Sequence, residues 1–158
     1  MNIFDREDIY EQNELSKVID DENIPFEELM SAFVGFICNV LMAKDNLRKL
    51  NIDVETEIEI RDYALQGEAF LDKSITKEVL KETRMSAISA WKTQDGFIAD
   101  SVAKTLLRIV ICSLYNKEDA EYDTHGSGEM LGVFFSLLLD LGSGYCKQFR
   151  YYLQEKLA

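Results

Sequence analysis

The sequence predicts an all-α protein, a single domain over residues 1–158 built as a bundle of six to eight helices. Apolar residues recur at spacings of three and four along most of the chain, as they do on one face of an α-helix. The chain has one proline, eight glycines and no linker-like stretch or internal repeat, which favours one compact unit. With 158 residues, 47% of them hydrophobic, the chain is long enough and apolar enough to bury a core of its own.

The strongest helical pattern covers residues 25–41, and a weaker helix over residues 8–19 precedes it. Pro25 suits a first helical turn, and Asn23 is a nearby candidate for the cap. Glu27 and Glu28 follow, where the helix dipole favours negative charge. The expected buried face consists of Phe26, Leu29, Met30, Phe33, Val34, Ile37, Val40 and Leu41. Residues 44–50 either extend this helix or form a short turn.

Residues 52–60 have an ambiguous pattern, because isoleucine and valine alternate with acidic residues at the period of a β-strand. The sequence offers no second clear strand to pair with this one, and an isolated strand is not stable. We therefore expect a helix over about residues 57–71 instead. Its expected buried face consists of Ile60, Tyr63, Ala64, Gly67 and Leu71.

Four further helices are expected along the rest of the chain. They cover residues 76–92, 98–115, 129–141 and 145–157. A turn over residues 94–96 and a polar loop over residues 116–128 separate them. The helix over residues 129–141 is apolar on nearly all sides, which predicts a central position in the core. Gly142 and Gly144 mark its end.

Negative charge is concentrated at the start of the chain. The first 28 residues hold ten acidic and two basic residues, which is −8 of a net charge of −12. This balance disfavours nucleic acid and anionic membranes as partners, since both are polyanions, and favours a basic protein. Apolar residues such as Ile9, Leu15 and Phe26 lie between the acids, so we expect a folded, fixed acidic surface instead of a disordered tail.

Two acidic clusters are therefore candidate surfaces for a basic partner, although solvated helix faces are the simpler interpretation. The first cluster consists of Asp5, Glu7, Asp8, Glu11, Glu14, Asp20, Asp21 and Glu22. The second lies in the expected polar loop and consists of Glu118, Asp119, Glu121 and Asp123. Trp91 is a further candidate, as an interface anchor, but its helical spacing from Leu80 and Ala87 favours a place in the core.

The cysteines and the chain start indicate the compartment. Cys38, Cys112 and Cys146 are an odd number, each within an apolar helical stretch, so we expect free thiols in a reducing cytoplasm. Their spacing is not that of a metal site, and no cofactor is expected. The first residues lack the features of a signal peptide, and the apolar run over residues 130–139 is too short to span a bilayer.

His125 is the only histidine, and it is the one candidate for catalytic chemistry. It could act as a general base beside Ser127, or bind a metal ion together with Asp123 and Glu129. A nucleophile elbow, however, needs a strand before its serine, and the sequence predicts a loop there. A turn in which Ser127 or Gly128 caps the next helix is the preferred interpretation.

Two short motifs, Leu65-Gln-Gly-Glu68 and Arg84-Met-Ser-Ala-Ile-Ser-Ala-Trp91, point to a known family. A tryptophan that follows a helical stretch of small residues resembles the sixth named immunity family of bacterial polymorphic toxin systems. The resemblance implies a cytoplasmic, all-helical protein that binds a secreted toxin domain and blocks its active site. It implies no catalytic residues and no cofactor.

The function expected from these observations is binding without catalysis, in which an acidic surface neutralises a basic toxin domain such as a nuclease. One alternative is a small metal-dependent hydrolase that uses Asp123, His125 and Glu129. Another is a homodimeric adaptor protein, in which the broad apolar helices of two copies pack together.

Overall fold

The computed structural model describes residues 10, 13–14, 24–93, 101–123 and 127–157. Within these ranges the protein is all-α, as the sequence predicts, and contains no β-strand. The helices are α2 (Phe26–Phe36), the π-helical segment η1 (Ile37–Leu41), α3 (Lys44–Lys49), α4 (Val54–Leu71), α5 (Lys77–Lys92), α6 (Ser101–Ile111), α7 (Lys117–Asp123), α8 (Ser127–Leu141) and α9 (Tyr145–Leu157).

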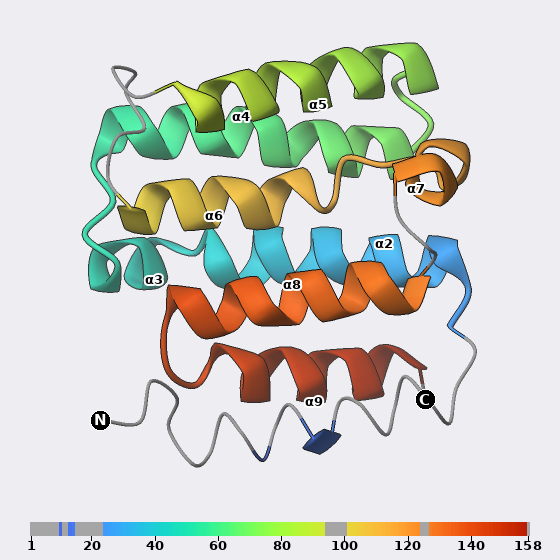
Figure 1. Ribbon diagram of the computed structural model, residues 1–158. Helices are drawn as coiled ribbons and strands as arrows, with labels where there is room; N and C mark the ends of the chain where they lie inside the picture. The colour runs from blue at the N-terminus through green and yellow to red at the C-terminus, as the bar shows by residue number, and fades with distance from the viewer. Residues whose placement is uncertain (1–9, 11–12, 15–23, 94–100, 124–126, 158) are drawn as a thin grey trace.

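The six longest helices lie side by side with nearly parallel axes, from α4 and α5 at the top of Figure 1 to α9 near the bottom. Helix α6 packs against α4, α5 and α8, and α2 packs against α4, α8 and α9. These two helices therefore occupy the middle of the bundle. The short helices α3 and α7 lie at opposite ends of it (Figure 1).

Four phenylalanine rings form the centre of the lower part of the core. Phe33 of α2 stacks on Phe134 of α8, with ring centroids 4.0 Å apart. Phe149 of α9 lies 4.7 Å from Phe134 and 5.1 Å from Phe36, between ring centroids. All four rings are buried, and such pairs contribute packing energy beyond the area they bury. This cluster joins α2 to α8 and α9, which begin about ninety residues or more further along the sequence.

The helix expected over residues 25–41 is present, but its last part differs from the expectation. Pro25 is the N-cap residue and lies just before the helix, while Asn23 falls outside the described residues. After Phe36 the backbone widens into the π-helical turn η1, and the amide of Met42 donates to the carbonyl of Ile37. Residues 44–49 then form a separate helix, so they do not extend the preceding one.

Helix α4 confirms the helical interpretation of the ambiguous segment and begins three residues earlier than expected. Asp53 caps it, because its Oδ1 accepts a hydrogen bond of 2.7 Å from the amide of Thr56. Ile60, Ala64 and Gly67 are buried as predicted. Leu71 is exposed instead, since it lies at the last turn of the helix.

The prediction of a polar loop over residues 116–128 is wrong, because residues 117–123 form helix α7. The Oδ1 atom of Asn116 accepts a hydrogen bond of 2.8 Å from the amide of Asp119, which is the bond of a helix N-cap. Ala120 is the buried residue that anchors this helix to the core. The other expected helices are present with shifted ends, while the helix over residues 8–19 lies almost wholly outside the described residues.

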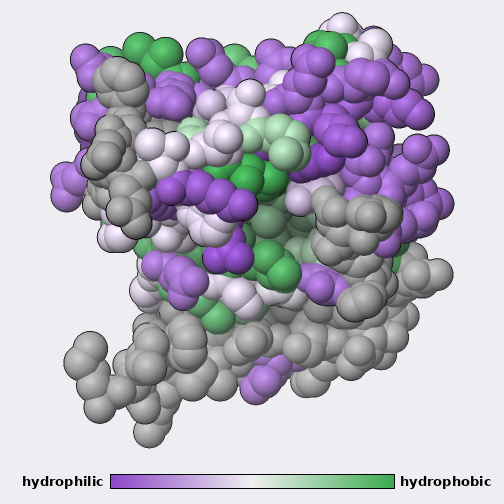
Figure 2. Space-filling view, turned by 45° about the horizontal axis from the view of Figure 1, so that its top comes forward, coloured by the Kyte–Doolittle hydropathy of each residue, from purple (hydrophilic) through white to green (hydrophobic). Residues whose placement is uncertain are grey.

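The surface is predominantly hydrophilic in the upper part of Figure 2, with isolated hydrophobic residues among the hydrophilic ones. Hydrophobic residues also gather in a hollow at the centre of that view. None of the described helices combines the length and the apolar character needed to cross a membrane.

Two glycines inside helices give a matched test of the packing. A Cβ atom at Gly35 would collide with the phenol of Tyr152, whereas one at Gly132 would meet no atom within 4 Å. Gly132→Ala should raise the free energy of unfolding by about 0.5–1 kcal/mol, because alanine is the better helix former. Gly35→Ala should lower it by about 1 kcal/mol, because the ring of Tyr152 must move. Urea unfolding followed by circular dichroism measures both, and equal effects at the two sites would contradict the packing described here.

Candidate functional site

Glu14 is the one member of the first acidic cluster that lies within the described residues. Glu14 is helical and half-buried, and the other seven members lie outside the described residues. The second cluster lies on α7, where Glu118 and Glu121 are exposed and Asp119 is half-buried. Asp123 is the last residue of the same helix. The predicted role of both clusters in partner binding stays a prediction.

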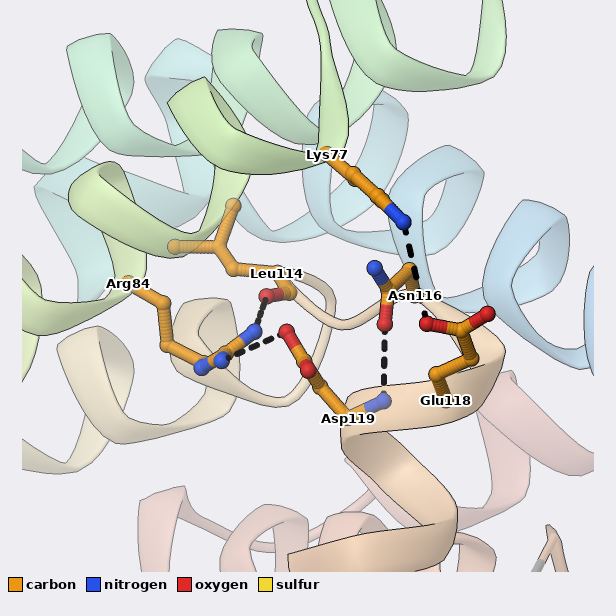
Figure 3. Close-up of polar contacts among 6 residues, drawn as sticks. All are labelled: Lys77, Arg84, Leu114, Asn116, Glu118 and Asp119. Atoms are coloured by element: carbon orange, nitrogen blue, oxygen red, sulfur yellow. Dashed lines mark hydrogen bonds and ion pairs between the residues drawn. The ribbon is translucent and has the colours of Figure 1, made fainter.

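A buried arginine links α5 to the segment that connects α6 and α7 (Figure 3). Arg84 is only 3% exposed. Its Nη1 atom donates to the carbonyl oxygen of Leu114 and its Nη2 atom to the Oδ2 atom of Asp119, each at 2.9 Å. The guanidinium also lies 4.4 Å from the ring centroid of Tyr115. A charge so deeply buried requires such partners, so Asp119 has a structural role within the chain.

A second ion pair joins α5 to α7 at the surface. Lys77 Nζ lies 3.8 Å from the Oε2 atom of Glu118, and both side chains are largely exposed (Figure 3). Two acids of the second cluster therefore already face bases of the same chain. A basic partner at this place would have to compete with them, and this weakens the case for α7 as the main docking surface.

Trp91 lies at the edge of the core. Its side chain is half-buried and packs against the hydrophobic core, and the guanidinium of Arg108 lies 5.0 Å from the centroid of the ring system. This position is that of a residue which joins α5 to α6. Arg84, Ala87 and Trp91 of the second motif thus all take part in packing.

The proposed catalytic or metal site of Asp123, His125 and Glu129 lies only partly within the described residues. His125 lies outside them, as does the side chain of Asp123, while Glu129 is exposed in the first turn of α8. Among the residues that the structure describes, no three histidine, cysteine, aspartate or glutamate side chains are grouped so that they could hold a metal ion.

The outward side of α4 is the surface that the sequence interpretation missed. Val54, Ile58 and Leu65 are 68%, 56% and 46% exposed, and the helical spacing places them on one side. We call this side the α4 outer face. It carries, besides these three residues, Glu55, Glu59, Asp62 and Glu68.

The charge of this helix was visible in the sequence. Residues 53–72 hold seven acidic residues and one basic residue, a net charge of −6, which equals half of the net charge of the whole chain. The basic residue, Arg61, donates 2.8 Å hydrogen bonds to Glu57 Oε1 and to the carbonyl of Met42. Within the described residues none of the four carboxylates of the α4 outer face has a basic group within 4 Å.

The three cysteines are free, as the sequence predicts. Burial raises the pKa of the Cys112 thiol to about 12. Burial, together with the neighbouring carboxylate of Glu68, raises the pKa of the half-buried Cys38 thiol to about 11. Thiols that hold their proton in this way are poor nucleophiles and poor metal ligands.

Comparison with known proteins adds no family to this description. No protein-family model matches the chain, and no curated protein or solved structure matches it significantly. The class of protein that the fold defines is therefore an all-α helical bundle, and its function has to be argued from its surfaces.

The network around Arg84 is predicted to be essential for stability. Arg84→Met should lower the free energy of unfolding by about 3 kcal/mol, because it leaves the carbonyl of Leu114 and the carboxylate of Asp119 without their donor. Lys77→Met is the matched control, and it should change this free energy by less than about 0.5 kcal/mol, because the pair with Glu118 is exposed. Urea unfolding of both variants measures the difference, and similar losses would show that Arg84 is not the critical group.

The Cys38 thiol is predicted to react slowly with iodoacetamide at pH 8 in the folded protein, and faster as the pH approaches 11. An unfolded cysteine has a pKa of 9.0, whereas that of folded Cys38 is about 11. The unfolded chain therefore loses this proton first, and the free energy of unfolding should fall as the pH rises from 9 towards 11. Peptide mapping by mass spectrometry measures the labelling. A folded protein that labels at pH 8 as fast as the urea-unfolded one would contradict the burial of this thiol.

Proposed function

We propose that the protein acts by binding, without catalysis, and that its α4 outer face docks a basic protein domain. The observation that carries the proposal is the exposure of Val54, Ile58 and Leu65 among carboxylates that have no basic partner among the described residues. The toxin domain implied by the resemblance to immunity proteins is the candidate partner.

The exposed aliphatic side chains supply the affinity in this proposal. Successive members lie four and seven residues apart, so they follow one another along the helix as a ridge. Burying such a side chain against a partner contributes about 1–2 kcal/mol at the usual energy per unit of apolar area. Their position on one side of a single helix makes them an exposed apolar surface, the kind of surface that marks a site of protein interaction.

The surrounding carboxylates favour a basic partner over a second copy of this chain. In a symmetric dimer the same face would meet itself, and the acids of the two copies would repel each other. A basic domain would meet opposite charge instead and would associate faster. A nuclease fits this description, because a protein that binds a polyanion carries a basic surface of its own.

The test takes as its probe a basic nuclease toxin domain, chosen by inspection of the genes that neighbour this one, and measures its association with the purified protein. The variant Glu55→Lys/Glu59→Lys/Asp62→Lys should lower the association rate at low salt by about tenfold or more, since it reverses the steering charge. Ile58→Ala/Leu65→Ala should mainly raise the dissociation rate, because it removes buried contacts.

Helix α5 offers the matched controls, because Glu78, Glu82 and Met85 are exposed there as well. Glu78→Lys/Glu82→Lys and Met85→Ala should leave both rates within about twofold of the wild type. Loss of binding only in Asp20→Lys/Asp21→Lys/Glu22→Lys would place the docking surface in the first acidic cluster and refute the α4 outer face. A dimer in light scattering that Ile58→Ala/Leu65→Ala dissolves would identify a second copy as the occupant.

A further inference from the structure

A cavity of about 370 Å³ lies where the start of α2, the end of α4 and the segment between α6 and α7 meet. We call it the α2–α4 cavity. Apolar side chains form most of its wall, among them Phe26, Met30, Phe70, Ile75 and Tyr115. Its volume is at the lower end of the range for small-molecule sites, which are mostly apolar with a few polar groups.

Gly67 forms part of the wall and brings α4 close to its neighbours. A Cβ atom there would lie 3.3 Å from the carbonyl oxygen and the hydroxyl of Ser113, and 3.3 Å from a methyl group of Val34. Helix α4 therefore lies close to α2 and to the residues that follow α6 at this wall of the cavity. The residues that follow α4 and those that follow α6 also line the cavity.

The polar groups that line the cavity are mainly hydrogen-bond donors. Lys73 and Lys117 line it, and within the described residues neither ammonium group has a carboxylate within 4 Å. Asn116 lines it too, and its Oδ1 atom is occupied by the amide of Asp119. The amide nitrogen of Asn116 points away from α7 in Figure 3 and donates to no described residue.

One carboxylate, that of Glu27, also lines the cavity. Together with the two lysines it leaves a net charge of +1 around a largely apolar space. The positive balance here contrasts with the net charge of −12 of the whole chain. A ligand that matches the site needs an apolar body and a single negative charge that accepts hydrogen bonds.

We propose that the α2–α4 cavity binds a small amphipathic carboxylate. The aliphatic or aromatic tail fills the space between Met30, Phe70 and Ile75, and the carboxylate takes hydrogen bonds from Lys73, Lys117 and Asn116. This site is separate from the α4 outer face, so it does not depend on the function proposed for that face.

Decanoate, kept below the concentration at which it forms micelles, is the probe, and decanol is the matched neutral ligand with the same tail. Isothermal titration should show decanoate binding about tenfold more tightly than decanol, through the charged hydrogen bonds. Lys73→Gln/Lys117→Gln should weaken decanoate binding by about tenfold and leave decanol unchanged, while Glu27→Gln should strengthen decanoate binding by about twofold.

Two further variants keep the outcome interpretable. Lys77→Gln/Lys81→Gln removes two lysines that do not line this cavity and should leave both affinities within about twofold of the wild type. Leu71→Trp, at the exposed rim, should obstruct the cavity and weaken both ligands. Absence of decanoate binding by the folded protein, equal affinity for decanol, or unchanged binding in Lys73→Gln/Lys117→Gln would each overturn the proposal.

Discussion

The buried guanidinium of Arg84 is the constraint on which the upper half of the bundle depends. Moving such a charge out of water costs several kcal/mol, so the protein must surround it with acceptors. The carbonyl of Leu114, the carboxylate of Asp119 and the ring of Tyr115 meet this need together. None of them belongs to α5, so the helix that carries Arg84 holds the whole segment between α6 and α7 in one place.

That segment also builds the wall of the α2–α4 cavity. Tyr115, Asn116 and Lys117 line the cavity, and they lie between the two groups that Arg84 binds, Leu114 and Asp119. A change in the hydrogen bonds of Arg84 would therefore alter the position of the residues that line the cavity. The α4 outer face is different, because it depends on the cap at Asp53 and on the packing of small residues on the inner side of the helix.

Hydrophobic spacing predicted the fold class and most helices, because a helix that buries a broad apolar side shows it directly in the sequence. Helix α7 was missed because Ala120 is its one described buried residue, and a single small side chain makes no periodic pattern. Its signal was the pair Asn116 and Asp119, which have the spacing of a helix cap. The early start of α4 was missed because Val54 and Ile58 face solvent, which disturbs the helical pattern.

The candidate surfaces were harder to predict than the fold. Acidic residues can be counted in a sequence, but their partners cannot, and Asp119 meets Arg84 from 35 positions away. The cavity is likewise formed by residues from three separate segments, and the sequence pattern of none of them indicates a cavity. The charge of α4, in contrast, can be counted along the chain, with seven acids and one base over residues 53–72.

The alternation of acids with isoleucine and valine over residues 52–60 has a further consequence for the unfolded chain. Such a segment is rich in β-branched residues and could pair with the same segment of another molecule when it is extended. In that arrangement Asp53, Glu55, Glu57 and Glu59 would lie along one side of each strand, and stacked strands would bring these charges together. The acids therefore act as gatekeepers that oppose aggregation while the protein is being synthesised or refolded.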